Sequence, residues 1–374
     1  GPARPWRTFT PPSATGDVAV LGADGRLALA NFHWEKPNGE KDPTRWTPVL
    51  EWKADIAVTP EVTRLLHVRV LDGRGLAGTP EWRAAGLDDQ GHLYLLVGPA
   101  PEGSTTPLAW SPRSLPGQDR ALSAIWSSDG QHLVVGTQGG KLLLLDPNAS
   151  EPLVAQIFGE PVTALGFALG QVSILAGGAQ GRLEAFQVLR RDGGIRLDRL
   201  HSFRGMTGAV RGFQASLRDK RFLAWSDREA VVDHLTTERR LFHVQRPDLH
   251  AAALRARGDG IALLERGGTL TRWSLEAPHP EVSWKTLWGK VHYEGYPEAA
   301  HVWQSTGGSD DFEPKLSLVP LVFGTLKGTF FAMLFALPLA LFGALYTSQF
   351  ASHRLRHVIK PAIEIMAALP SVVL

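Results

Sequence analysis

The sequence contains no cysteine among its 374 residues. This absence excludes disulfide bonds, thiolate zinc sites and cysteine nucleophiles, and it suits an oxidising compartment, where unpaired thiols are a liability. The patterns Gly-x-Ser-x-Gly and His-Glu-x-x-His, which mark two common classes of hydrolase, are also missing. We therefore predict no catalytic residue, no metal site and no bound cofactor in this chain.

Charged residues are absent from a run of 25 residues near the C-terminal end, 328–352. A helix rises about 1.5 Å per residue, so this run reaches roughly 37 Å, against about 30 Å for the hydrocarbon core of a bilayer. The alternative is a buried helix of a soluble protein, but such a helix usually has a polar side and this run has none. We predict a transmembrane helix within residues 316–352.

Basic residues follow the uncharged run directly. The segment 353–360 contains Arg354, Arg356 and Lys360, and the short cytoplasmic loops of membrane proteins are enriched in lysine and arginine. We predict that 353–360 is a cytoplasmic loop, so that residues 1 to about 315 lie outside the cytoplasm. Because no signal peptide precedes so large a domain, we expect a further membrane helix upstream of it in the full protein.

The charge balance gives no reason to expect a nucleic-acid partner. The chain has 39 basic and 37 acidic side chains, of which residues 316–374 hold four and one, leaving 35 and 36 in the first 315 residues. The basic excess therefore belongs to the membrane-proximal part and follows from membrane topology. The last segment, 361–374, is apolar again, and we expect it to begin the next transmembrane helix.

A repeat of about 40 to 48 residues runs through the middle of the chain. Apolar runs open at residues 121, 161, 209 and 250, and Asp-Gly or Gly-Gly turns separate the short β-rich runs that follow each of them. Three or four short strands in a unit of this length are typical of a β-propeller blade. The units resemble WD40-type repeats, although the Trp-Asp pair that ends such repeats is intact in none of them.

Three weaker units precede the clear repeats, at residues 18–30, 54–71 and 84–97. We predict an all-β fold, a WD40-like propeller of six or seven blades, over residues 1–281. Segment 7–11 is a candidate for the outermost strand of the last blade, because propellers often close their ring with an N-terminal strand. A β-sandwich followed by a smaller β domain is the alternative.

Tryptophan is abundant, with twelve residues in the chain. Trp284, Trp288 and Trp303 cluster in a predicted connector, 282–315, just ahead of the transmembrane helix. Indole rings prefer the headgroup level of a bilayer, so we predict that these three lie at the membrane interface. Quinone-cofactor dehydrogenases are also tryptophan-rich propellers, but the tryptophans of this chain do not recur at one position of the repeat.

The end of the chain combines several short motifs. Residues 319–325 follow the pattern Val-Pro-x-x-x-Gly-Thr, and Ile-Glu followed by Ala-x-Leu-Pro-Ser-Val-Val occurs within 363–373. Together with the basic segment between them, these motifs resemble the second and third membrane helices of the permease subunit of bacterial phosphate ABC importers (PstC type). The positions that carry the resemblance are Gly324, Thr325, Glu364, Pro370 and Ser371.

The resemblance implies a multi-pass protein of the bacterial inner membrane, with residues 1 to about 315 in the periplasm. It also implies three partners, namely a second permease subunit, a cytoplasmic ATPase dimer that binds the ATP, and a periplasmic phosphate-binding protein. In that family the loop before the second helix is short, whereas in this chain roughly 300 residues precede the corresponding helix. We expect the inserted propeller to be a docking or sensing module. The alternatives are a membrane-tethered periplasmic enzyme, either a quinoprotein-type dehydrogenase or a hydrolase, and a cap over the permease.

A single cysteine, introduced into a chain that has none, tests the predicted topology. We expect Asp129→Cys to react with a membrane-impermeant maleimide in spheroplasts. The control, Leu355→Cys, lies in the predicted cytoplasmic loop and is expected to react only after the membrane is permeabilised. Labelling of Asp129→Cys only after permeabilisation would contradict the topology.

Overall fold

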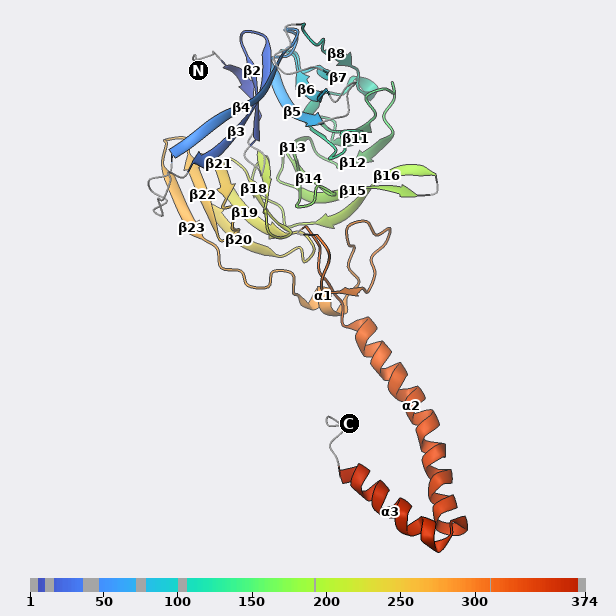
Figure 1. The fold of residues 1–374 in the computed structure, drawn as a ribbon. Coiled ribbons are helices and arrows are strands. Elements are labelled where there is room, and N and C mark those ends of the chain that lie inside the picture. Colours follow the sequence, from blue (N-terminus) through green and yellow to red (C-terminus); the bar gives the residue numbers. More distant parts are fainter. Residues whose placement is uncertain are drawn as a thin grey trace. The chain divides into compact units, whose positions relative to one another are not determined.

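The computed structural model describes residues 6–10, 17–35, 47–71, 79–99, 106–191, 193–309 and 311–368. The chain divides into two compact units. The first comprises Gly1–Ala300 and Gln304–Leu316, and the second comprises His301–Trp303 and Ser317–Leu374. The first unit holds six blades of β-sheet (Figure 1), so this part of the chain is a six-bladed β-propeller.

The strands of the blades follow the order of the chain. Blade 1 comprises β1 (Trp6–Phe9), β2 (Asp17–Gly22), β3 (Arg26–Glu35) and β4 (Thr47–Ala57), and blade 2 comprises β5 (Arg64–Leu71), β6 (Glu81–Leu87), β7 (Leu93–Pro99) and β8 (Ser111–Arg113). Blade 3 comprises β9 (Ala121–Trp126), β10 (Leu133–Thr137), β11 (Lys141–Leu145) and β12 (Val154–Ile157), and blade 4 comprises β13 (Val162–Phe167), β14 (Ser173–Gly178), β15 (Leu183–Arg191) and β16 (Gly194–Ser202). Blade 5 comprises β17 (Gly212–Ala215), β18 (Arg221–Trp225), β19 (Glu229–His234) and β20 (Arg240–Gln245), and blade 6 comprises β21 (Leu249–Leu254), β22 (Gly260–Glu265) and β23 (Leu270–Ser274). A short 3-10 helix, Pro116–Gln118, precedes blade 3.

Two opposite faces of the propeller follow from this meander. Neighbouring strands within a blade are antiparallel and successive in the chain, so alternate turns lie at opposite ends of the sheet. One end carries the turns between the first and second strands and between the third and fourth, such as 216–220 in blade 5; we call it the clamp face. The other end carries the turns between the second and third strands, such as 226–228, and the loops that lead to the next blade; we call it the arginine face.

The blades are apolar on both sides because each is covered by its neighbours. In β10 every side chain of Leu133–Thr137 is buried, which is why this strand appears in the sequence as a continuous apolar run rather than an alternating one. Five apolar clusters fill the spaces between consecutive blades, from blades 1 and 2 to blades 5 and 6. This packing between blades is the hydrophobic core of the unit.

A half-buried histidine adds a polar contact between blades 2 and 3. The Nδ1 atom of His67 accepts a hydrogen bond from the backbone N–H of Trp126 at 3.3 Å. Burial, together with the charge of Arg69, lowers the pKa of His67 to about 3. The imidazole therefore stays neutral and remains able to accept this bond at physiological pH.

The sequence analysis located the first strands of four blades, since β9, β13, β17 and β21 begin within three residues of the predicted starts at 121, 161, 209 and 250. It counted one unit too many before blade 3 when it allowed for seven. Segments 54–71 and 84–97 are not separate blades, because β5 pairs directly with β6, with Arg64 opposite Leu87. The sheets form propeller blades and not the β-sandwich that was the alternative.

The prediction for segment 7–11 was wrong. Strand β1 pairs with β2 in blade 1, with Phe9 opposite Val20, and does not extend the last blade. Blade 6 has three strands among the described residues, and there β23 pairs only with β22. Pro11 lies outside the described residues.

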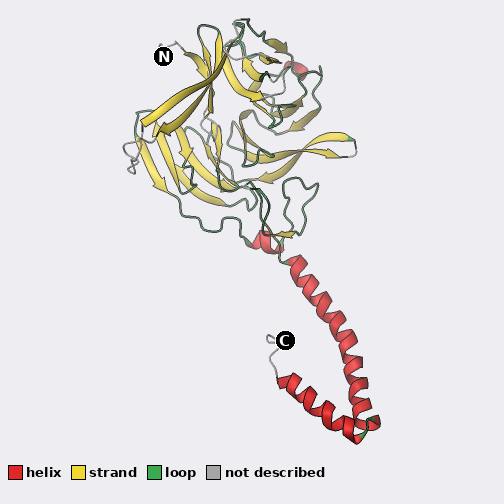
Figure 2. Cartoon of the chain, in the orientation of Figure 1, coloured by secondary structure: helices red, strands yellow, loops and turns green. Residues whose placement is uncertain are grey.

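The second unit contains one helix that is long and apolar enough to cross a membrane. Helix α2 (Val319–Leu345) continues through Pro338 into a π-helical turn, Tyr346–Phe350 (Figure 2). None of the side chains of α2 is buried. The whole span has 32 residues. The hydroxyl of Thr325 donates to the Leu321 carbonyl at 2.9 Å, so this polar group is satisfied within the helix.

Helix α3 (His353–Ala368) includes residues 353–360, where we expected a loop. Arginine, leucine and lysine have high helix propensity, so a basic segment need not be irregular. The guanidinium of Arg356 also donates to the carbonyls of Thr347 (3.0 Å) and Ser348 (2.7 Å), which belong to the π-helical turn. These bonds satisfy carbonyls at a helix end, as basic side chains commonly do.

Replacing the buried Trp126 tests the packing between blades 2 and 3. We expect Trp126→Ala to lower the free energy of unfolding by about 3 to 5 kcal/mol, because the indole is fully buried and leaves a cavity. The matched control is Trp284→Ala, whose indole is 82% exposed and whose loss is expected to change stability little. Equal effects in chemical denaturation would contradict this packing.

Candidate functional site

The chain that follows blade 6 returns to the clamp face of blades 4 and 5. Lys220, in the β17–β18 turn, forms an ion pair with Glu294 and donates to the Leu169 carbonyl at 2.8 Å. The Ser173 hydroxyl donates to the second oxygen of Glu294 at 2.7 Å. The Lys220 side chain is only 2% exposed. A charge this deeply buried requires its partner, so the pair holds 291–300 on the propeller.

A second carboxylate extends this network. Glu313 accepts hydrogen bonds from the Thr236 hydroxyl and, at 3.0 Å, from the backbone N–H of Glu294. Burial raises the pKa of Glu313, and the neighbouring Glu294 carboxylate raises it further. Lys315 lies 4.8 Å from the ring centre of Phe312. We call the contacts of Lys220, Glu294 and Glu313 the clamp.

Further contacts of the clamp face come from the backbone. The Gln187 side chain accepts from the Gly295 N–H at 2.8 Å and donates to the Tyr296 carbonyl at 2.9 Å. The Thr237 hydroxyl donates to the Pro280 carbonyl at 3.0 Å. The segment that we predicted as a connector is therefore bonded to blades 4 and 5 at several points.

Four arginines gather on the arginine face of blades 5 and 6: Arg211, Arg228, Arg246 and Arg266, which we call the arginine cluster. Arg211 forms two hydrogen bonds to the Asp227 carboxylate, at 3.0 and 2.7 Å, and Arg266 lies 3.7 Å from the same group. The hydrogen bonds from Arg211 lower the pKa of Asp227, and the charges of Arg266 and Arg228 lower it further. One carboxylate thus faces three of the cations.

The backbone fixes the position of the arginine cluster. The N–H of Arg246 donates to the Arg228 carbonyl at 2.7 Å, and the N–H of Arg266 donates to the Asp248 carbonyl at 2.9 Å. The Arg246 guanidinium lies 5.5 Å from the ring centre of Trp273 and 3.7 Å from Glu265. The same loops carry three carboxylates, Asp227, Glu265 and the exposed Asp248, for these four guanidinium groups, so the cluster keeps an excess of one positive charge.

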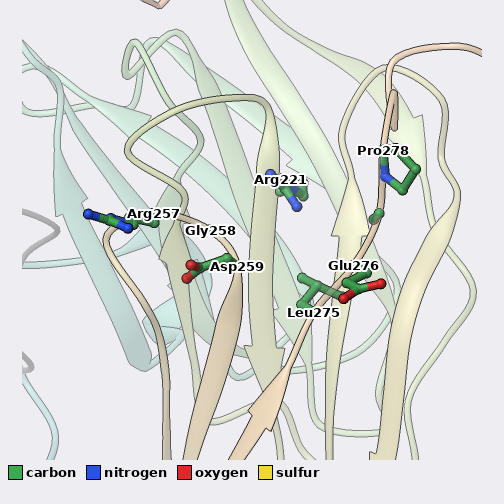
Figure 3. Close-up of a pocket in the computed structure, with 8 residues that line it drawn as sticks. Arg221, Arg257, Gly258, Asp259, Leu275, Glu276 and Pro278 are labelled. Atoms are coloured by element: carbon green, nitrogen blue, oxygen red, sulfur yellow. The ribbon is translucent and has the colours of Figure 1, made fainter.

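A pocket of about 380 Å³ lies at the clamp-face end of blades 5 and 6 (Figure 3). Its lining includes Arg221 at the start of β18, Arg257 and Asp259 in the β21–β22 turn, and Glu276 after β23. Burial opposes ionisation of Asp219 beneath it, but hydrogen bonds from Arg221 outweigh burial and lower the pKa of this carboxyl. The lining carries two cationic and two anionic side chains. The pocket therefore prefers neither an anionic nor a cationic ligand.

The residues that the sequence analysis singled out are distributed over both units. Trp284 and Trp288 lie on α1 (Trp284–Trp288) in the first unit and are exposed. The remaining ones belong to the second unit, where Trp303, Gly324, Thr325, Arg354, Arg356, Lys360 and Glu364 are all exposed. Pro370 and Ser371 lie outside the described residues. Among the described residues, no three His, Asp or Glu side chains are grouped as metal ligands.

The sequence analysis missed both the clamp and the arginine cluster. The cluster left a signal, since Arg228, Arg246 and Arg266 stand 18 and 20 residues apart, about half of the blade repeat. At that spacing successive positions fall on the same face of a propeller. The clamp could not be recognised from the sequence, because Ser173 and Glu294 are 121 residues apart and do not occupy corresponding positions of a repeat.

Comparisons with known proteins bear on the fold alone. No protein-family model matches the chain, and no curated protein matches it. Among solved structures, the β-propeller domain of Cps50 (Swd1) from Myceliophteria thermophila is similar, with a TM-score of 0.49 and 14% sequence identity over 72% of this chain and 84% of that one. The six blades rest on the strand pairing of this chain itself.

Removing the cation of the clamp tests its role. We expect Lys220→Met to lower the free energy of unfolding by about 3 to 5 kcal/mol, because it leaves Glu294 and Glu313 buried without a counter-charge. The control is Arg255→Met, an exposed arginine of the corresponding turn in blade 6, with an expected effect below about 0.5 kcal/mol.

The pH dependence of this loss has a definite sign. The pKa of Glu313 is raised in the folded state, so protonation favours the folded state at low pH and this contribution is lost as pH rises through the folded pKa. The effect of Lys220→Met is therefore expected to be smaller at pH 5 than at pH 8 in chemical denaturation. An effect independent of pH would contradict the assignment of Glu313 to the clamp.

Proposed function

We propose that this chain is part of the permease subunit of a bacterial phosphate-type ABC importer, and that its propeller docks a soluble partner in the periplasm. The observation that carries the proposal is the apolar span Val319–Phe350, whose side chains are uncovered and whose first turns contain Gly324 and Thr325 of the permease motif. Under this proposal ATP binds to a partner ATPase dimer, and a second permease subunit completes the path.

The arginine cluster supports a docking role. Arg211, Arg228 and Arg266 are exposed and Arg246 is half-buried, and the backbones of Arg246 and Arg266 are held by hydrogen bonds to other loops of the same face. A rigid surface with excess positive charge attracts a partner with an acidic face and raises its rate of association. We propose that this partner is the soluble phosphate-binding protein of the importer. A membrane-tethered propeller enzyme is a fold-compatible alternative, since propellers host many functions.

The two faces of the propeller separate the proposed roles. The clamp lies on one face and the arginine cluster on the other, because alternate turns of a meander lie at opposite ends of the sheet. The chain leaves the propeller unit through residues of the clamp face, at Lys315 and Leu316. The segment that precedes α2 binds the clamp face and does not cover the arginine cluster, so a partner can reach the cluster.

Reversing two charges of the arginine cluster tests docking. We expect Arg228→Glu with Arg266→Glu to lower phosphate uptake by about tenfold or more at limiting phosphate and low salt, because repulsion replaces attraction toward an acidic partner. Saturating phosphate-binding protein is expected to restore part of the rate. Uptake is measured with the complete importer in proteoliposomes.

The matched control reverses two exposed arginines of blade 6 on the clamp face, Arg255→Glu with Arg257→Glu. This variant is expected to keep its dependence on the binding protein. Unchanged uptake in the arginine-cluster variant, at every phosphate and salt concentration, would overturn the docking role.

A further inference from the structure

Helix α1 is a single turn whose two sides differ sharply. The Ser283 hydroxyl accepts from the Thr286 N–H at 3.1 Å, and the Thr286 hydroxyl accepts from the Ser283 N–H at 2.9 Å, which completes a capping box. Thr286 is buried. Trp284 and Trp288, four residues apart, share the other side and are 82% and 46% exposed.

The turn is fastened to blade 5, so its indoles extend from a rigid body. Lys285 pairs with Glu238 at 2.6 Å, and Arg239 donates to the Val282 carbonyl at 3.1 Å. Both partners belong to the β19–β20 turn on the clamp face. A tryptophan can bury 150 to 250 Å² of surface, so two exposed indoles held in place form an apolar patch that favours a covering surface.

The path of the chain indicates what covers the patch. Helix α1 contacts β25 (Lys315–Leu316), and α2 begins three residues later, at Val319. Wherever α2 enters a bilayer, the strand that α1 contacts is therefore only a few residues along the chain from the bilayer surface. Indole rings prefer the headgroup level, where the ring is in an apolar layer and the N–H is hydrated.

Basic side chains of the same face favour anionic headgroups. The β15–β16 hairpin extends from blade 4 (Figure 1), and its clamp-face end carries the exposed Arg190, Arg191 and Arg196. Lys290, just after α1, is also exposed. Glu298 lies 3.7 Å from Arg191. A basic surface near a bilayer is attracted to anionic lipid headgroups.

We propose that α1 is an interfacial anchor: Trp284 and Trp288 insert among the lipid headgroups, the hairpin arginines contact anionic headgroups, and the propeller is seated on the bilayer by its clamp face. The inference rests on the proposed function in one respect, that α2 spans the membrane. It adds a second point of membrane contact and names the lipid class.

Three single-cysteine variants of the full chain test the anchor, each labelled with a nitroxide and reconstituted in vesicles containing anionic phosphatidylglycerol. Trp288→Cys reports on the anchor, Ile157→Cys on a 76% exposed site of blade 3, and Leu337→Cys on the middle of α2. We expect collisions with a water-soluble nickel complex to be at least threefold less frequent at 288 than at 157, and rarest at 337.

Each result has a definite meaning. Equal nickel accessibility at 288 and 157, with 337 protected, overturns the anchor and leaves the membrane span intact. Full accessibility at 337 overturns the span, and with it the proposed function.

The lipid class is tested by replacing the hairpin arginines with alanine (R190A, R191A, R196A), which is expected to raise accessibility at 288 in anionic vesicles and not in zwitterionic ones. An equal rise in both overturns the anionic preference.

Discussion

The buried ion pair between Lys220 and Glu294 holds the segment 291–300, which follows blade 6, against the propeller. A lysine and a carboxylate removed from water are each costly to bury alone, so they hold each other and the chain around them in place. The last residues of the propeller unit are held in place by Glu313, which accepts a hydrogen bond from the Glu294 N–H, and by Lys315, which lies over the ring of Phe312. Apolar packing holds the blades to one another, whereas the polar contacts of the clamp hold the following segment on the clamp face.

The clamp also gives the two faces of the propeller different uses. The face that binds Pro280, Glu294 and Glu313 also carries the exposed indoles of α1 and the basic hairpin of blade 4, which suit a lipid surface. The opposite face carries the arginine cluster, in which Asp227 organises the guanidinium groups without neutralising them. Arginine attracts both of the occupants that we propose, an acidic soluble partner and an anionic bilayer, and the meander keeps the two proposed surfaces on opposite faces.

Sequence periodicity located blades 3 to 6 because their hairpins are tight and their strands are short. It failed in the first third of the chain, where long connections separate paired strands: β5 and β6 form one sheet, although nine residues lie between Leu71 and Glu81. The predicted use of segment 7–11 failed for a related reason. An N-terminal strand has two possible partners in a ring, its own blade or the last one, and local sequence does not choose between them.

The sequence by itself determined the repeating β structure and the uncovered apolar helix, since both depend on runs of neighbouring residues whose spacing and hydropathy are local properties. Only the tertiary structure decided the clamp, the arginine cluster and the exposure of Trp284 and Trp288 on one side of a fixed turn. These features join residues from different blades or from positions up to 121 residues apart, as Ser173 and Glu294 are. Such residues become neighbours when the ring forms, and a buried charge finds its partner only then.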